Sequence, residues 1–73
     1  MTKINYMEVT SYNEGSKRAD VVRTIGQEPN YFGCRYYVNN NALGIEWYPT
    51  HSVRYSQDAA ENYIKGIKKY SPK

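Results

Sequence analysis

The sequence predicts an α+β domain, built as an antiparallel three- to four-stranded β-meander with one C-terminal α-helix packed on one face. Two observations indicate this fold. Up to Tyr48, runs of β-branched and aromatic residues alternate with clusters of turn residues. After Pro49, apolar residues recur at helical spacing instead. A chain of 73 residues has room for a single small domain, residues 1–73.

The first half of the chain predicts two strands joined by a turn. Residues 4–12 alternate in polarity, and residues 13–16 have turn chemistry, with Gly15 free to adopt a positive φ. Residues 19–25 are rich in β-branched side chains, which favours a second strand. A short helix that begins at Ser16 is the alternative, so residues 16–25 remain open between strand and helix.

Residues 31–38 form the strongest predicted strand. One of its faces is mostly apolar and carries the small thiol of Cys34, and we expect this face to point to the core. The other face places two tyrosines around an arginine. The residues of this second face are Tyr31, Gly33, Arg35 and Tyr37.

Three asparagines, residues 39–41, predict a hairpin turn because asparagine tolerates left-handed backbone conformations. Residues 43–48 then return as the next strand. Simple alternation assigns the side chains of this strand to two opposite faces, each of which carries one aromatic residue. Leu43, Ile45 and Trp47 share one face, and Gly44, Glu46 and Tyr48 share the other.

The last predicted element is a helix. Ser56 is the expected N-cap, and acids precede lysines in the segment, which suits the helix dipole. Gly66 is expected inside the helix, at a cost of about 1 kcal/mol relative to alanine. Because one helix covers one face of a sheet, the other face is expected to stay open. The apolar stripe of the helix consists of Ala60, Tyr63, Ile64 and Ile67.

Composition points to a cytoplasmic protein. A single cysteine, Cys34, cannot form an internal disulfide, which is typical of a reducing compartment. Residues 1–6 lack the apolar stretch of a signal peptide, and no apolar run approaches the length of a membrane span, so no membrane partner is expected. A chain this short has a thin core, which also favours self-association as a homodimer.

Catalytic chemistry is not predicted. The single histidine, His51, falls in the loop before the helix, whereas Cys34 falls on the core face. Acidic residues are scattered, and no glycine-rich phosphate loop is present. We therefore expect no enzyme activity, no catalytic residue, no metal site and no cofactor.

The nine tyrosines suggest a recognition surface instead. Aromatic residues and arginine dominate binding energy at protein interfaces, so the tyrosine- and arginine-rich open face is the expected site for a protein partner. An alternative interpretation is that these tyrosines only pack against each other across strands. The predicted partner-binding residues are Tyr31, Arg35 and Tyr37, extended by Tyr48 and Glu46 of the next strand.

Nucleic acid is the alternative partner. Aromatic rings on a sheet can stack bases while lysines contact phosphates. The C-terminal segment supplies candidate contacts for phosphates or for an acidic partner, at Lys65, Lys68 and Lys69. These lysines also have a simpler interpretation, as solvated residues that satisfy the end of the helix.

The C-terminal half of the chain resembles small accessory proteins of tailed bacteriophages. The resemblance lies in residues 34–40 (Cys-Arg-Tyr-Tyr-Val-Asn-Asn), 46–52 (Glu-Trp-Tyr-Pro-Thr-His-Ser) and 55–63. Such proteins are made in the infected cell to bind and inhibit a host factor or a defence complex. The resemblance therefore implies a phage-encoded inhibitor of a host or defence protein, working in the host cytosol. It carries no assigned active residues.

Overall fold

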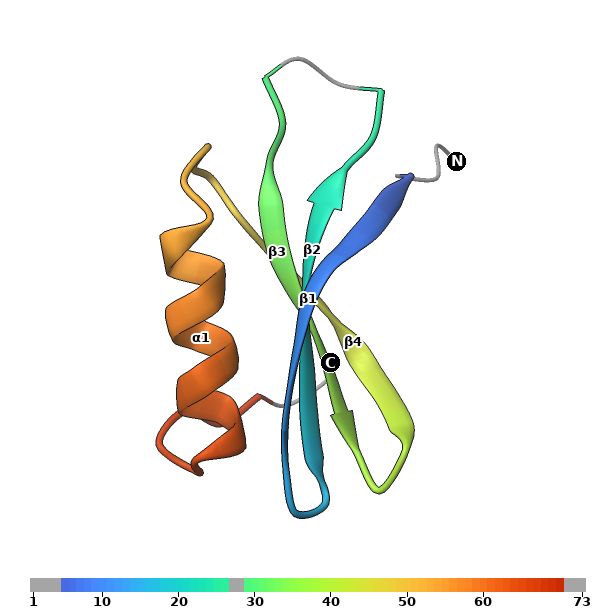
Figure 1. Cartoon of the computed structure of the whole chain (residues 1–73), viewed down its shortest axis with the longest axis vertical. Coiled ribbons are helices and arrows are strands. Elements are labelled where there is room, and N and C mark those ends of the chain that lie inside the picture. Colours follow the sequence, from blue (N-terminus) through green and yellow to red (C-terminus); the bar gives the residue numbers. More distant parts are fainter. Residues whose placement is uncertain (1–4, 27–28, 71–73) are drawn as a thin grey trace.

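The computed structural model describes residues 5–26 and 29–70. The helix packs against one face of a four-stranded antiparallel sheet with the strand order β1-β2-β3-β4, so the predicted α+β meander is confirmed (Figure 1). In the described residues, no helix is both long and apolar enough to span a membrane. The elements are β1 (Tyr6–Glu14), β2 (Lys17–Thr24), β3 (Phe32–Val38), β4 (Asn41–Tyr48) and α1 (Arg54–Ile64).

The segment that the sequence left open between strand and helix is β2. It pairs with β1 on one side and with β3 on the other, so it is a central strand. Ala19, Val21 and Val22 are almost completely buried. Burial on both faces of a pleated sheet suits β-branched side chains, which explains why this segment forms a strand.

The asparagine turn between β3 and β4 is confirmed. Asn39 and Asn40 have φ angles of 50° and 67°, and Val38 pairs with Asn41 across the turn. Positive φ at both central residues is the signature of the tight two-residue hairpin turn that matches the twist of a sheet. The turn fixes which residues of β3 and β4 pair with each other next to it.

A β-bulge then reverses the expected faces of β4. Tyr37 pairs with Ala42, but Tyr36 pairs with Gly44, so Leu43 is an extra residue without a partner on β3. Gly44 adopts a φ of 144°, a conformation that L-residues rarely take. Because side chains alternate along a strand, a one-residue shift moves every following side chain to the opposite face.

Tyr48 and Glu46 consequently lie on the helix side, and the prediction that they extend the open face is wrong. In the shifted register, Glu46 pairs with Cys34, whose side chain is in the core. The Tyr48 hydroxyl donates a hydrogen bond to the Glu46 carboxylate at 2.6 Å. The buried Tyr36 hydroxyl donates to the same oxygen at 3.0 Å. These two bonds satisfy polar groups that would otherwise be costly next to the core.

Aromatic rings fill much of the core between the sheet and α1. Tyr36 is fully buried, with its ring centroid 4.7 Å from that of Tyr63 and 4.5 Å from that of Tyr70. The Tyr63 hydroxyl donates to the backbone carbonyl of Tyr37 at 3.0 Å. Small residues of α1, Ala59 and Ala60, let the helix approach these rings. Tyr36 and Tyr63 are therefore core residues, as expected for the apolar face of residues 31–38 and for the apolar stripe of the helix, and Tyr70 packs against them.

The helix starts earlier than predicted. Ser56 is buried inside α1, and its hydroxyl has no partner among the described residues, so it is not the N-cap. Val53 occupies the cap position, and the Ser52 hydroxyl accepts a hydrogen bond from the Arg54 amide at 3.3 Å. The serine whose hydroxyl bonds to the first turn of the helix is thus Ser52, and not Ser56.

The helix also ends earlier than predicted. Gly66 has a φ of 81°, its amide donates to the Tyr63 carbonyl, and the Ile67 amide donates to the Asn62 carbonyl. This pair of bonds is the Schellman arrangement, which glycine favours because it adopts left-handed conformations without strain. Gly66 therefore ends the helix. Ile67 lies beyond it and is 72% exposed, so its assignment to the apolar stripe is wrong.

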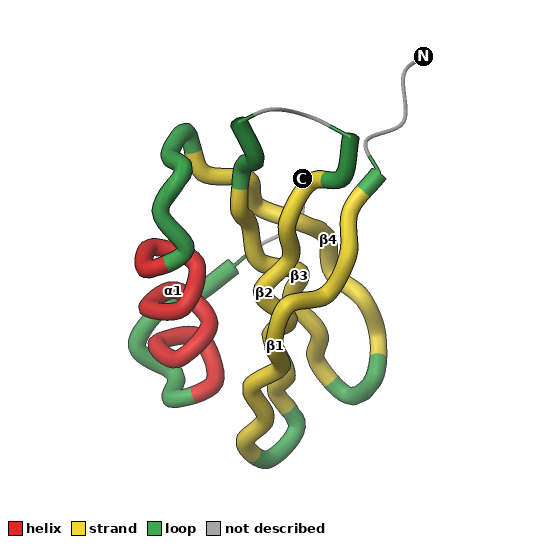
Figure 2. Tube along the Cα trace, turned by 45° about the horizontal axis from the view of Figure 1, so that its top comes forward, coloured by secondary structure: helices red, strands yellow, loops and turns green. Residues whose placement is uncertain are grey.

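The sheet curls toward the side that α1 leaves uncovered. Trp47 lies on that side, against Gly33, and a Cβ atom at Gly33 would come within 2.9 Å of the indole ring. Tyr6, from the opposite edge strand, meets Trp47 edge-on with ring centroids 5.9 Å apart. Figure 2 shows the strong twist of the strands. Val22 and Thr24 are buried on this side even though no helix covers them.

We predict that Glu46→Gln lowers stability at neutral pH and removes part of its pH dependence. Burial acts to raise the pKa of the Glu46 carboxyl, but the hydrogen bonds it accepts outweigh this effect, and the pKa lies below its usual value of 4.5. The donors are Tyr48, Lys68 and Tyr36. Because the folded-state pKa is lowered, the stabilisation is present above about pH 4.5 and is lost as pH falls through the folded-state pKa.

Urea unfolding at pH 7 and at about pH 3 measures this effect. The gap in unfolding free energy between wild type and Glu46→Gln should narrow at the lower pH. Glu61→Gln is the control, since Glu61 forms an exposed ion pair with Lys65 at 3.5 Å, for which a change within about 0.5 kcal/mol is expected. An equal gap at both pH values would contradict the role of Glu46.

We predict that Gly33→Ala destabilises the protein by about 1–3 kcal/mol because the added methyl group overlaps its neighbours. The new Cβ would stand 2.7 Å from the Glu46 carbonyl and 2.9 Å from the Trp47 ring. The fluorescence emission maximum of Trp47, the only tryptophan, should shift in this variant. Gly15→Ala is the control, because its Cβ meets nothing within 4 Å and strains only the backbone. Unchanged emission in Gly33→Ala would contradict the contact.

Candidate partner-binding face

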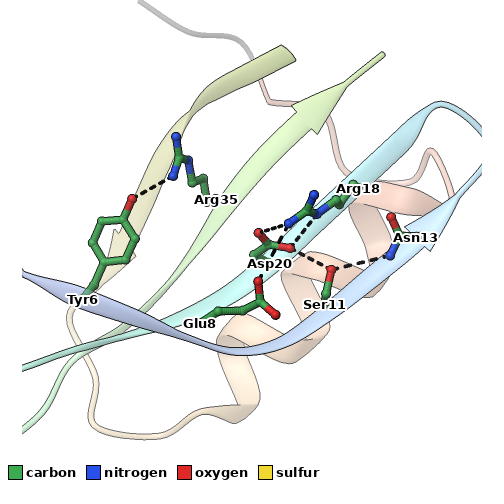
Figure 3. Close-up of polar contacts among 7 residues, drawn as sticks. All are labelled: Tyr6, Glu8, Ser11, Asn13, Arg18, Asp20 and Arg35. Atoms are coloured by element: carbon green, nitrogen blue, oxygen red, sulfur yellow. Dashed lines mark hydrogen bonds and ion pairs between the residues drawn. The ribbon is translucent and has the colours of Figure 1, made fainter. Parts of the chain in front are cut away.

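The open face is the side of the sheet opposite α1, and all four strands contribute to it. Cross-strand pairing places Ser11, Asp20, Arg35 and Ile45 in one row across the sheet. Figure 3 shows the polar part of the face. Its main members are Tyr6, Glu8, Ser11, Arg18, Asp20, Arg35, Tyr37, Ile45 and Trp47.

Arg35 and Tyr37 lie together on this face, at the position expected from the alternation of β3. The Arg35 guanidinium is 5.3 Å from the centroid of the Tyr37 ring, within the range of a cation–π contact. It also donates a hydrogen bond from Nη1 to the Tyr6 hydroxyl at 3.0 Å (Figure 3). Two rings from two strands therefore hold the guanidinium.

Among the residues that the structure describes, Arg35 has no acidic partner of its own. Within residues 5–26 and 29–70, no carboxylate forms an ion pair with it. Asp20 is its direct neighbour on β2, yet that carboxylate is bound to Arg18. A guanidinium has five N–H donors, and the bond to Tyr6 uses one of them. Donors of Arg35 are thus left for an external acceptor.

Arg18 and Asp20 form the fixed part of the face. Nε and Nη2 of Arg18 donate to the two carboxylate oxygens of Asp20, each at 2.9 Å, and the Ser11 hydroxyl adds a bond of 2.7 Å (Figure 3). Asp20 is 4% exposed, so its charge is both buried and fully paired. Arg18 also lies 3.8 Å from Glu8. Arg18 therefore pairs with both Asp20 and Glu8 on this face.

Tyr37 lies against both arginines. The Arg18 guanidinium is 4.5 Å from its ring centroid, closer than that of Arg35. Burial raises the pKa of the Tyr37 hydroxyl, although the positive charge of Arg35 acts against this rise. The hydroxyl is consequently protonated at neutral pH and can both donate and accept a hydrogen bond.

Tyr31 is separated from this group. It precedes the first residue of β3, and its ring packs on His51 with centroids 4.8 Å apart. Its amide donates to the Thr24 hydroxyl at 3.0 Å, which ties the loop to the end of β2. It is 40% exposed. Of the residues predicted to form the partner surface, the structure brings together Arg35 and Tyr37. It places Tyr31 in a loop, and Tyr48 and Glu46 on the helix side.

Tyr6, Arg18 and Trp47 belong to the open face but escaped the sequence-based selection. Trp47 was assigned to the opposite face because simple alternation missed the bulge. Gly44 is the signal that could have revealed it, since a glycine within a strand often marks a bulge. Tyr6 and Arg18 reach the face through pairing with distant residues, for which the sequence contains no direct signal.

The C-terminal lysines lie away from the open face. Lys65 pairs with Glu61 at 3.5 Å on the exposed surface of the helix. Lys68 pairs at 3.2 Å with Glu46, which the bulge places on the helix side of the sheet. Lys69 lines a hollow on that same side, together with Lys68. The aromatic face and these lysines therefore do not form one continuous surface.

Cys34 and His51 are in different environments. The Cys34 side chain is fully buried, and its thiol donates to the Ser56 carbonyl at 2.9 Å. Burial raises the pKa of this thiol to about 12. His51 is exposed, and its Nδ1 lies 2.9 Å from the Asn30 carbonyl. The described residues contain no group of three or more His, Cys, Asp or Glu side chains that could hold a metal ion.

We predict that Cys34 reacts with thiol reagents only when the fold opens. At pH 8 a thiol with a pKa of about 12 is thiolate for only about one molecule in ten thousand, and the side chain is also inaccessible. Labelling should accelerate at least about a hundredfold in denaturant. Ser52→Cys in a Cys34→Ala background is the control and should react at the rate of an exposed thiol. Rapid labelling of native Cys34 would contradict its burial.

Comparisons with known proteins identify no relative of this chain. No protein-family model matches the chain, and neither a curated protein nor a solved structure matches it.

Proposed function

We propose that the protein is a non-catalytic protein-binding module whose interface is centred on Arg35 of the open face. The observation that carries this proposal is the arginine itself. Arg35 is held by Tyr6 and Tyr37, and no carboxylate among the described residues pairs with it. An arginine positioned by aromatic rings is the type of residue that supplies most of the binding energy at protein interfaces.

The chemistry around Arg35 indicates what the partner contributes. A guanidinium binds a carboxylate through two parallel hydrogen bonds, so an Asp or Glu side chain of the partner would match it. Trp47 and Ile45 offer apolar surface on the same face for the rest of the contact. The Asp20 carboxylate is buried and bound by Arg18, so it is not exposed to the carboxylate of an acidic partner.

The resemblance of the C-terminal half to accessory proteins of tailed bacteriophages gives this proposal a biological setting. We propose that the module is phage-encoded and that its partner is a host or defence protein in the cytosol of the infected cell. Inhibition would follow from occupation of the partner's surface, because the proposal requires no catalytic group.

Nucleic-acid binding is the second candidate and has less support. It requires the aromatic face to stack bases while the C-terminal lysines hold phosphates. These two groups of residues lie on opposite sides of the sheet. The paired acids on the open face also reduce its positive potential.

A pull-down from bacterial lysate, with and without nuclease, tests the proposal. We expect one stoichiometric protein partner that survives nuclease treatment. Arg35→Ala should weaken binding at least about tenfold, and Arg35→Lys should restore only part of the loss because lysine lacks the bidentate geometry. Arg54→Ala is the matched control, since Arg54 is an exposed arginine at the start of α1.

Two outcomes would overturn the proposal. Capture that disappears with nuclease, and an affinity for DNA or RNA that falls log-linearly with salt, would assign the protein to nucleic-acid binding. Equal effects of Arg35→Ala and Arg54→Ala would show that the partner does not use the open face.

A further inference from the structure

A basic hollow lies on the helix side of the sheet, where α1 ends. Its volume is about 330 Å³. Lysines from two distant parts of the chain line it, and apolar side chains of the β3–β4 hairpin form its wall. The lysines are Lys17, Lys68 and Lys69, the hairpin contributes Val38 and Leu43, and Tyr63 and Tyr70 complete the lining.

Turns bring these lysines together. Lys17 is the first residue of β2, and its Nζ lies 5.5 Å from the centroid of the Tyr63 ring. The turn at Gly66 sends the chain back from α1 toward the hairpin (Figure 1). Tyr70 then packs over Gly44, where a Cβ atom would stand 2.6 Å from the Tyr70 hydroxyl. The segment that carries Lys68 and Lys69 is thus held against the sheet.

The hollow has an excess of positive charge. Lys68 is paired with Glu46 at 3.2 Å. Lys17 and Lys69 form no ion pair with any of the carboxylates that the structure describes. Among the described residues, no carboxylate therefore offsets the charge of these two ammonium groups, which line the same hollow.

We propose that this hollow binds the phosphate group of a small phosphorylated ligand. Ammonium groups bind phosphate as point charges, and a phosphate monoester carries between 1.5 and 2 negative charges at about neutral pH, which matches two unpaired lysines. A nucleic-acid strand requires a basic groove that follows successive phosphates. Here the lysines converge on one place. The site lies on the opposite side of the sheet from Arg35, so it does not depend on the proposed function.

The test is an NMR titration of the ¹⁵N-labelled protein with inorganic phosphate and, separately, with adenosine monophosphate, each at ionic strength matched with NaCl. Saturable shifts are expected for Lys17, Lys69 and Tyr70. Lys69→Ala should weaken binding about tenfold, because it removes a charged partner of the phosphate. Lys65→Ala is the control, because Lys65 does not line the hollow. Lys69 is exposed, so its substitution leaves the fold intact.

Tighter binding of adenosine monophosphate than of inorganic phosphate would support the proposal and identify an ester as the ligand. Equal binding of the two would also support it and show that the phosphate alone is recognised. The proposal would be overturned if neither compound gave saturable shifts, or if Lys65→Ala weakened binding as much as Lys69→Ala. Binding of a single-stranded oligonucleotide much tighter than of the monophosphate would overturn it as well.

Discussion

The insertion of one residue in β4 decides how the two sides of this protein are composed. With Leu43 bulged out, Glu46 and Tyr48 turn to the helix and Trp47 turns to the open face. The polar cluster under α1 and the indole ring over Gly33 both depend on this shift. In the unshifted register, the tryptophan would compete with α1 for the core, and a carboxylate would lie on the open face.

Local patterns sufficed for the type and order of the elements, because each depends on neighbouring residues. The asparagine turn and the β-branched run of β2 are examples. Features that depend on pairing between distant residues could not be predicted from the sequence. The bulge at Leu43 changed the face of Tyr48, and the left-handed conformation of Gly66 shortened the helix. The wrong predictions of the face of Tyr48 and of the helix end each involve a glycine whose role depends on its backbone angles. Alternation and helical periodicity do not describe these angles.

The candidate site was partly predictable for the same reason. Arg35 and Tyr37 share a face because they are two residues apart on one strand, and alternation alone establishes this. Their neighbours come from other strands: Arg18 pairs directly with Tyr37 across β2 and β3, and Tyr6 reaches Arg35 from the edge strand β1. Asp20 lies on the central strand β2 and is buried with its partner Arg18, so its burial also depends on pairing with the neighbouring strands.

Both outer strands of the sheet are irregular, which limits how two copies of the chain can meet. β1 is bulged between Glu8 and Thr10, and β4 is bulged at Leu43. A bulge interrupts the regular row of amide and carbonyl groups that another strand would need for continuous pairing. Joining two sheets edge to edge is therefore disfavoured at either margin. These bulges favour self-association through side chains over growth into extended sheets.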